Sequence, residues 1–329
     1  MVTTVAEPLV MAVDLGGTNF RLAVVNRAGE ILHRHSQPTV KGGGREVLLR
    51  RLAEAMLELT AAQNIPAGRI QAVGLGIPGL VEPEPGLVVK APNIPELDHV
   101  PLGPELRRLL PWPVVLENDA NLFTWGEAYQ GAGQGEENML GITLGTGVGG
   151  GLVLGGKLWH GSKGTAAEIG HLTIEPGGEQ CNCGNYGCLE TLASATWTVQ
   201  WTVSRLAAGE PSSLESLWRQ NPRELSARRI AQAAAAGDRL AQQAFQRVGR
   251  ALGIAIADVV HLLGLPLIIL GGNFALSWDH FMGSLEEELA KRMTFFPRAD
   301  LSLRPAKLGD NAGLLGAARL AWDLTEQIQ

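Results

Sequence analysis

The sequence has no excess of basic charge and no long apolar run. It holds only three cysteines, too few for a scaffold built on disulfides. Its 329 residues carry a formal net charge of -6, whereas binding to a nucleic-acid backbone normally needs a basic surface. No apolar run reaches the roughly 20 residues that span a bilayer. The first residues show no basic segment and no cleavage pattern of a secretory signal. We therefore expect a cytoplasmic protein that binds neither nucleic acid nor membrane.

The remaining composition is that of a folded enzyme. Hydrophobic residues make up 45% of the chain and charged residues 18%, which is typical of a globular protein with a large core. The length favours two lobes over one compact body. We expect a small α/β lobe from residues 1–118 together with 312–329, and a large α/β lobe from residues 119–311.

A strand–turn–strand unit with glycine and threonine in its turn occurs twice. The first turn follows Asp14, and the second is Gly145-Thr146-Gly147. No helix separates the strands of the first unit, so the chain does not open with a βαβ dinucleotide-binding motif. Two such turns on two lobes are suited to one nucleotide. Strands are expected at 9–14, 20–25, 30–35, 70–77, 114–117, 139–144, 148–154 and 267–270, and helices at 45–63, 104–110, 238–263 and 312–324, with another beginning at 118–119.

All three cysteines lie in one glycine-rich loop, and a histidine precedes the first of them by ten residues. Three thiolates and one imidazole form a ligand set typical of tetrahedral structural zinc. Incidental buried cysteines are the alternative, but apolar thiols would not gather in a polar loop. Four protein ligands leave no open position for catalysis, so we expect a structural ion. Its ligands would be His171, Cys181, Cys183 and Cys188.

The first turn has the features of a phosphate-binding loop. Gly16 and Gly17 let backbone N–H groups approach phosphate oxygens, while Thr18 and Asn19 add side-chain donors. Asp14, at the end of a strand, can hold Mg²⁺ through a water molecule. An ordinary Gly-Gly hairpin with a solvated aspartate is the alternative. The chain contains no Walker A sequence.

Two further groups of polar residues are candidates for chemistry. Glu117-Asn118-Asp119-Ala120-Asn121 stands at a strand-to-helix junction, where a carboxylate can take the proton of an attacking hydroxyl. The alternative there is a plain Asx cap of the helix. Glu168 and Glu190 flank the cysteine loop and are suited to accept hydrogen bonds from sugar hydroxyls. Solvated surface carboxylates are the alternative for this pair.

Taken in order, these segments resemble the ROK family of bacterial-type sugar kinases and repressors. The resemblance covers nearly the whole chain, and the cysteine-rich stretch is its most specific part. The matching segments are Asp14–Thr18, Gly79, Ala91–Asn93, Glu117–Asn121, Leu144–Gly151, Glu168–His171, Cys181–Glu190, Gly271–Asn273 and Gly309–Gly313.

The resemblance implies an α/β fold of the actin-like ATPase (ribonuclease H-like) class, with two lobes around a cleft. It implies a kinase that transfers the γ-phosphate of ATP, with Mg²⁺, to the 6-hydroxyl of a hexose. Glucose is the expected substrate. N-acetylglucosamine and N-acetylmannosamine kinases of the family share the residues concerned, so these sugars remain alternatives. A homodimer or homotetramer is also implied.

The resemblance also implies roles for individual residues. Asp119 would be the catalytic base, and His171 would bind zinc through one ring nitrogen and the sugar through the other. Sugar-binding residues would be Gly79, Asn93, Asn118, Asp119, Glu168, His171 and Glu190. ATP-binding residues would be Asp14, Gly16, Gly17, Thr18, Asn19, Gly145, Thr146, Gly147, Gly271, Gly272 and Asn273.

Two functions outside catalysis are weighed against the kinase. Repressors of the family carry an added N-terminal helix-turn-helix domain, and here only 13 residues precede Asp14. A non-catalytic sugar sensor is expected to lose the base or the phosphate loops, and this sequence keeps both. The enzyme is therefore the expected function.

Overall fold

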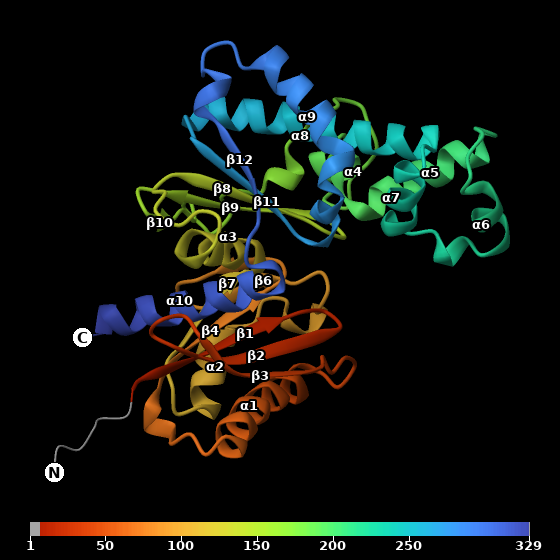
Figure 1. Ribbon diagram of the computed structural model, residues 1–329. Helices are drawn as coiled ribbons and strands as arrows, with labels where there is room; N and C mark the ends of the chain where they lie inside the picture. The colour runs from red at the N-terminus through yellow and green to blue at the C-terminus, as the bar shows by residue number, and fades with distance from the viewer. Residues whose placement is uncertain (1–6, 329) are drawn as a thin grey trace. The chain divides into compact units, whose positions relative to one another are not determined.

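Two five-stranded sheets with matching strand order form the framework of the protein. The computed structural model describes residues 7–328 (Figure 1). The first sheet has the order β3-β2-β1-β4-β7 and the second β10-β9-β8-β11-β12. The strands of the first sheet are β1 (Leu9–Leu15), β2 (Asn19–Asn26), β3 (Ile31–Pro38), β4 (Ile70–Ile77) and β7 (Val114–Asn118). Those of the second are β8 (Met139–Leu144), β9 (Val148–Leu154), β10 (Lys157–Leu158), β11 (Leu267–Gly271) and β12 (Ser302–Pro305).

The repeated turn predicted from the sequence is thus part of a larger repeat. In the first sheet β1 pairs antiparallel with β2 and parallel with β4, and β4 pairs parallel with β7. In the second sheet β8 pairs parallel with β11, and β11 parallel with β12. Each glycine-threonine turn therefore joins the central strand of its sheet to a neighbouring strand. The first turn joins β1 to β2, and the second joins β8 to β9. A small third sheet pairs β5 (Leu80–Glu82) with β6 (Leu87–Lys90).

The chain divides into two compact units. Unit 1 comprises Met1–Glu137, Gly151–Ala166 and Lys307–Gln329, and unit 2 comprises Asn138–Gly150 and Ala167–Ala306. This division differs from the sequence-based boundary after residue 118, because helix α3 (Asp119–Gln130) belongs to unit 1. The reason is the packing of α3 against α10 (Ala312–Ile328), where a side chain on Gly316 would overlap the carbonyl group of Leu122.

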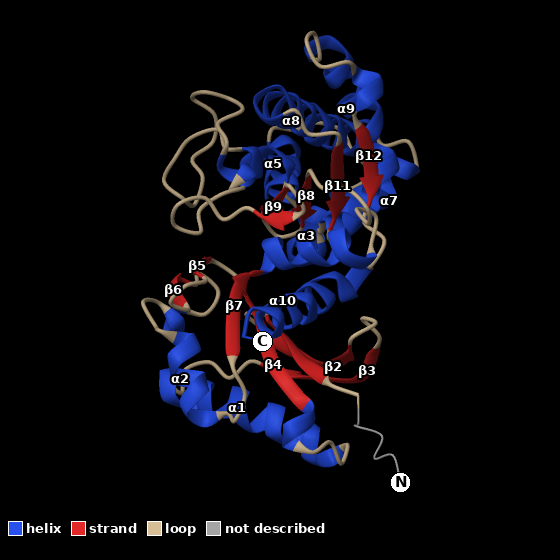
Figure 2. Ribbon diagram, turned by 90° about the vertical axis from the view of Figure 1, so that its left-hand side faces the viewer, coloured by secondary structure: helices blue, strands red, loops and turns tan. Residues whose placement is uncertain are grey.

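The first sheet carries a helical layer on each face. Successive residues of a strand point to opposite faces. Along β1, Leu9, Met11 and Val13 join the core formed with α1 (Arg45–Ala62). Val10 and Ala12 instead join the core formed with α10. Figure 2 shows α1 and α10 on opposite sides of these strands. Helix α2 (Leu102–Leu109) contributes to the same core as α1.

Unit 2 is mainly helical outside its sheet, and the helix expected at 238–263 is the longest of its helices. Its long helix α8 buries a stripe of apolar residues spaced four apart, from Leu240 to Val260. The helix ends at Gly264, which has the left-handed conformation that suits glycine at a helix C-terminus. The helices are α4 (Leu189–Ala193), α5 (Ala195–Ala207), α6 (Glu215–Gln220), α7 (Ala227–Ala235), α8 (Arg239–Leu263) and α9 (Trp278–Arg292).

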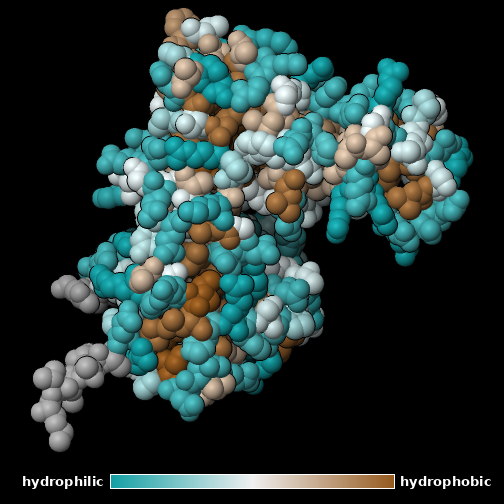
Figure 3. Space-filling view, viewed as in Figure 1, coloured by the Kyte–Doolittle hydropathy of each residue, from teal (hydrophilic) through white to brown (hydrophobic). Residues whose placement is uncertain are grey.

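The outer surfaces of the helices are largely polar. Figure 3 shows hydrophilic residues over most of the helical surface of unit 2, and apolar residues gathered on one face of unit 1. Among residues 7–328, no helix combines the length and hydropathy needed to cross a membrane.

Candidate functional site

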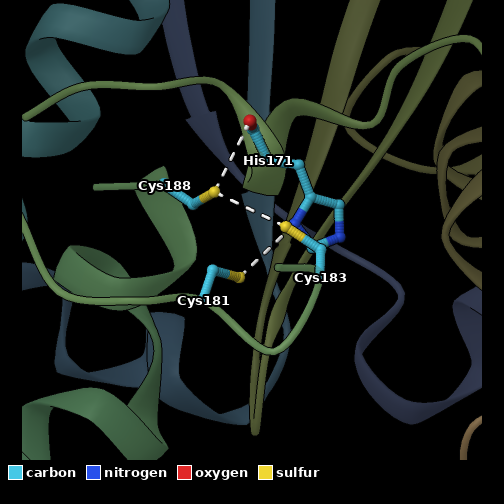
Figure 4. Close-up of side chains that lie close together, drawn as sticks. All are labelled: His171, Cys181, Cys183 and Cys188. Carbon is cyan, nitrogen blue, oxygen red and sulfur yellow. Dashed lines mark hydrogen bonds between the residues drawn. The ribbon is translucent and has the colours of Figure 1, made fainter. Parts of the chain in front are cut away.

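The structure brings together the four residues predicted to bind a metal. The ligand atoms of His171, Cys181, Cys183 and Cys188 all lie within 4.8 Å of one another. Figure 4 shows the imidazole and the three thiols turned toward a common space. The Sγ atoms of Cys183 and Cys188 are 3.8 Å apart, and Nδ1 of His171 is 3.7 Å from the Sγ of Cys181. Zinc–sulfur bonds of about 2.3 Å at tetrahedral angles give sulfur separations of about 3.8 Å, so the donor set fits zinc.

The two ring nitrogens of His171 face different partners. Nδ1 points to the cysteine cluster, while Nε2 lies 4.0 Å from a carboxylate oxygen of Glu168. Such a ring, fixed on its metal side, presents its other nitrogen in one orientation. In the sequence-based prediction one ring nitrogen would bind the metal and the other the sugar, and here these would be Nδ1 and Nε2.

Glu168 occupies a defined backbone turn just before His171. Its φ and ψ are -70° and 53°, and the N–H of Ile169 donates to the carbonyl of Ala167 at 2.7 Å. These values are those of an inverse γ-turn. Burial raises the pKa of the Glu168 carboxyl; nearby His171 opposes this rise and the charge of Glu190 adds to it.

Glu190 connects the cysteine loop to the second glycine-threonine turn. Its Oε2 accepts a hydrogen bond of 3.1 Å from the N–H of Val148, and its Oε1 accepts one of 3.8 Å from the thiol of Cys181. A Cβ on Gly147 would overlap Oε2 of this carboxylate, so a larger residue there would displace the Glu190 side chain. The sequence did not predict this link, because 42 residues separate Glu190 from Val148.

The second turn also lines a large pocket. This cavity of about 1100 Å³ is lined by Gly145, Thr146 and Asn273, all predicted ATP-binding residues. Every lining residue belongs to unit 2. Gly272 precedes Asn273 with a φ of 86° and lies against the carbonyl of Leu144, so the ends of β8 and β11 meet here. The carboxyl ends of adjacent parallel strands are a common place for ligands in α/β sheets.

The first turn has a similar construction in unit 1. The N–H of Gly16 donates to the carbonyl of Asn19 at 2.9 Å, which closes a tight turn. Gly17 lies so close to Asn93 that a Cβ would approach the Asn93 Cβ to 2.9 Å. The structure thus brings the predicted sugar residue Asn93 beside the predicted phosphate loop.

Asp14, near the end of β1, lies beside the start of α10, with Oδ2 3.7 Å from the position of a Cβ on Gly313. It also forms an ion pair with Arg21, whose Nη1 donates to the carbonyl of Asp310 at 2.9 Å. Arg21 was missed in the sequence, although it stands seven residues after Asp14 and pairs with it across the β1–β2 hairpin.

The predicted catalytic segment forms the junction of β7 and α3. The Oδ1 of Asn118 caps α3 by accepting from the N–H groups of Ala120 and Asn121, at 2.8 and 3.1 Å. The Nδ2 of Asn118 donates to the carbonyl of Gly79 at 2.8 Å. Asp119 is the first residue of α3, and its Oδ1 accepts from the N–H of Ala120 at 2.9 Å. The cap proposed as an alternative is therefore made by Asn118, and it orients the residue that follows.

The other residues missed by the sequence reasoning form the wall of the unit 2 pocket. They come from the start of α7 and from the segment after β11, and include Ser226, Gln232, Phe274 and His280. No spacing rule joins these segments, since their proximity depends on how α7 packs against the chain that follows β11.

The repeated sheet order, with a glycine-threonine turn in each unit, is that of an α/β protein of the actin-like ATPase class. The ROK family profile matches residues 10–323. The glucokinase of Thermotoga maritima is 37% identical over 94% of this chain and 96% of its own. The chain belongs to the ROK family, and both the predicted family and the predicted fold class are confirmed.

Two solved structures are also similar. A Streptomyces griseus ROK glucokinase in complex with glucose and AMPPNP has 33% identity and a TM-score of 0.79, with 96% of this chain and 99% of that chain covered. A ROK family transcriptional regulator, a homologue of the E. coli MLC protein, has 31% identity and a TM-score of 0.88. The match covers 98% of this chain and 79% of the regulator.

Proposed function

We propose that the protein is an ATP-dependent sugar kinase that phosphorylates the 6-hydroxyl of glucose. The observation that carries this proposal is the similarity, over nearly the whole chain, to glucokinases, one of them crystallised with glucose and AMPPNP. The helix-start aspartate, the cysteine loop and the pocket of unit 2 support it, because they supply a base, polar groups for a sugar and space for a nucleotide.

Asp119 is the catalytic base in this proposal. Phosphoryl transfer asks for little covalent work by the protein, since most of the rate comes from positioning and charge stabilisation. A carboxylate that takes the proton of the attacking hydroxyl typically contributes about 10²–10⁴-fold. The Asn118 cap and the bond from the Ala120 N–H restrict the orientations of this carboxylate.

The hydroxyl groups of the sugar are bound by residues from several segments. Glu168, Glu190 and the Nε2 of His171 act as polar partners on the cysteine-loop side, and the closeness of Glu168 both to the imidazole and to Glu190 supports this role. Asn118, Asn93 and the backbone at Gly79 are further partners. The hydrogen bond from Asn118 to Gly79 supports a common role for these two residues.

The nucleotide is bound by the two glycine-threonine turns and the unit 2 pocket. Gly145, Thr146, Gly147, Gly271, Gly272 and Asn273 act from unit 2, and Asp14, Gly16, Gly17, Thr18 and Asn19 from unit 1. The Mg²⁺ that accompanies ATP neutralises phosphate charge, and Asp14 is the residue suited to hold it.

The Cys₃His cluster holds a structural zinc ion in this proposal. Burial raises the pKa of the Cys181 thiol to about 12, so this sulfur becomes a thiolate ligand only beside a cation. His171, Cys181, Cys183 and Cys188 fill all four positions of a tetrahedral site. The ion would fix the loop that carries Glu190 at its end and orient the His171 ring.

The proposal is tested by assaying ADP release from ATP with glucose, N-acetylglucosamine, N-acetylmannosamine, mannose and fructose, with Asp119→Asn alongside. We expect turnover on glucose in the presence of Mg²⁺, and a loss of about 10²–10⁴-fold in kcat for Asp119→Asn. If an N-acetyl sugar is turned over faster than glucose, that sugar becomes the assigned substrate, and the kinase activity still stands. Sugar binding without any turnover would instead establish a sensor.

A further inference from the structure

A buried carboxylate stands directly before the proposed catalytic segment. Glu117 is the fourth residue of β7 and only 1% exposed. Its Oε1 accepts hydrogen bonds from the N–H of Asn118 at 2.8 Å and from the Nδ2 of Asn121 at 2.9 Å. One oxygen of Glu117 therefore holds the chain on both sides of Asp119.

The second oxygen of Glu117 has a histidine partner. His160 Nε2 lies 2.5 Å from Oε2, and 33% of the His160 side chain is exposed. The hydrogen bond to Glu117 raises the pKa of His160 against the opposing effect of burial. Among residues 7–328, no lysine or arginine forms an ion pair with Glu117, so His160, when protonated, is the described group that can balance its charge. A buried carboxylate without such a partner is strongly unfavourable.

The partner comes from a distant part of the chain. His160 follows β10, lies 43 residues beyond Glu117, and precedes Glu168 by eight. Its carbonyl accepts from the N–H of Ala166 at 3.2 Å, so the intervening loop closes on itself. The contact therefore anchors the loop 159–166 to the end of β7. Neither the glycine-threonine turns nor the cysteine cluster includes this residue.

We infer that His160 is a positioning residue for phosphoryl transfer, which acts by holding Glu117 and through it the backbone around Asp119. The inference rests on the proposed function, because it concerns the orientation of the proposed base. Without His160, Glu117 is free to turn toward another donor or toward water, and the Oε1 contacts to Asn118 and Asn121 loosen. A displacement of about 1 Å in a reacting group can cost on the order of 100-fold in rate.

The test compares His160→Phe, which removes the donor, with His160→Gln, whose amide N–H can reach the same carboxylate. We expect His160→Phe to lower kcat by at least about ten-fold at saturating glucose and ATP. The KM for ATP should change less than about two-fold, since no residue of this group lines the unit 2 pocket. His160→Gln should keep most of the kcat. His35→Gln, on the exposed part of β3, is the matched control and should equal the wild type.

A double variant separates positioning from simple charge compensation. His160→Phe with Glu117→Gln removes the buried charge and so restores folding if the single variant is unstable. We expect its kcat to stay low while its Tm returns toward that of the wild type. Recovery of both Tm and kcat, or an unchanged kcat in a folded His160→Phe, would overturn the inference. Lack of sugar phosphorylation by the wild type itself would instead remove the proposed function on which the inference depends.

Discussion

At the scale of the residue, Ala167 is held in an unfavourable conformation beside a proposed substrate contact. Its φ is 63°, in the left-handed region where a Cβ is disfavoured by roughly 1–2 kcal/mol. Its carbonyl accepts the bond that closes the turn at Glu168, so this conformation and the orientation of Glu168 are connected. The contacts of the surrounding loop offset the conformational free energy that this backbone geometry costs.

Replacing Ala167 with glycine should stabilise the protein. Relief of the left-handed strain exceeds the extra entropy of an unfolded glycine, roughly 0.4–1 kcal/mol, so a net gain of about 0.5–1 kcal/mol is expected. Thermal unfolding should show Tm higher by roughly 1–2 °C.

The matched control is the neighbouring Ala166, whose φ is not positive. Ala166→Gly gains no relief and should lower Tm. Equal shifts in both variants would show that Ala167 carries no strain.

At the scale of the element, the cysteine loop lacks regular secondary structure, and in our proposal a zinc ion holds it. Residues 172–187 contain no helix or strand, only the isolated bridges Thr173–Cys188 and Gln180–Tyr186. Local backbone hydrogen bonds also shape the loop, such as those from Cys181 N–H to the Asn185 carbonyl at 2.8 Å and from Gly187 N–H to the Glu179 carbonyl at 2.9 Å. A bound metal would add a cross-link through its four ligands. The orientation of His171 and Glu190 should therefore change when the metal is removed.

We expect one zinc ion per chain by metal analysis of dialysed protein, and loss of that zinc in Cys183→Ser. The variant should have a lower Tm and a KM for glucose raised by roughly 10–100-fold, because the ligand that orients His171 is released. Asn182→Ser, in the same loop but outside the ligand set, should retain zinc and Tm. A zinc-free wild type with unchanged Tm would contradict the structural role.

Elements and sites differ in how far the sequence predicts them. Strand 70–77 and the turns at Asp14 and Gly145 were predicted because local periodicity and glycine chemistry determine them. The metal ligands were predicted because His171 and the cysteines lie close in the chain. The contact of His160 with Glu117 depends instead on sheet order and on the course of a loop, and local spacing carries no signal for it.

At the scale of the whole molecule, the unit 2 pocket and the predicted catalytic segment fall on separate parts of the chain. The pocket of about 1100 Å³ is lined entirely by unit 2, whereas Asp119 and Asn118 belong to unit 1. Substitutions in the pocket should therefore change the KM for ATP and the KM for glucose by different amounts.

Ala231→Trp, in the pocket wall on α7, should raise the KM for ATP at least about ten-fold, about 1.4 kcal/mol of binding. The KM for glucose should be nearly unchanged. Ala236→Trp, exposed at the end of α7 and outside the lining, is the control. An equal rise in both KM values, or none for ATP, would place the nucleotide elsewhere.

The packing of α10 on the first sheet has a consequence for synthesis on the ribosome. Val10, Ala12 and Ala23 are translated early, yet the helix that covers them, with Leu314 and Trp322, is translated last. The continuous stretch 167–306 of unit 2 emerges before that helix. Unit 2 can thus become compact while one face of the first sheet is still bare, which reverses the usual order in which N-terminal parts fold first. Nascent chains stalled before residue 312 would offer that apolar face to chaperones.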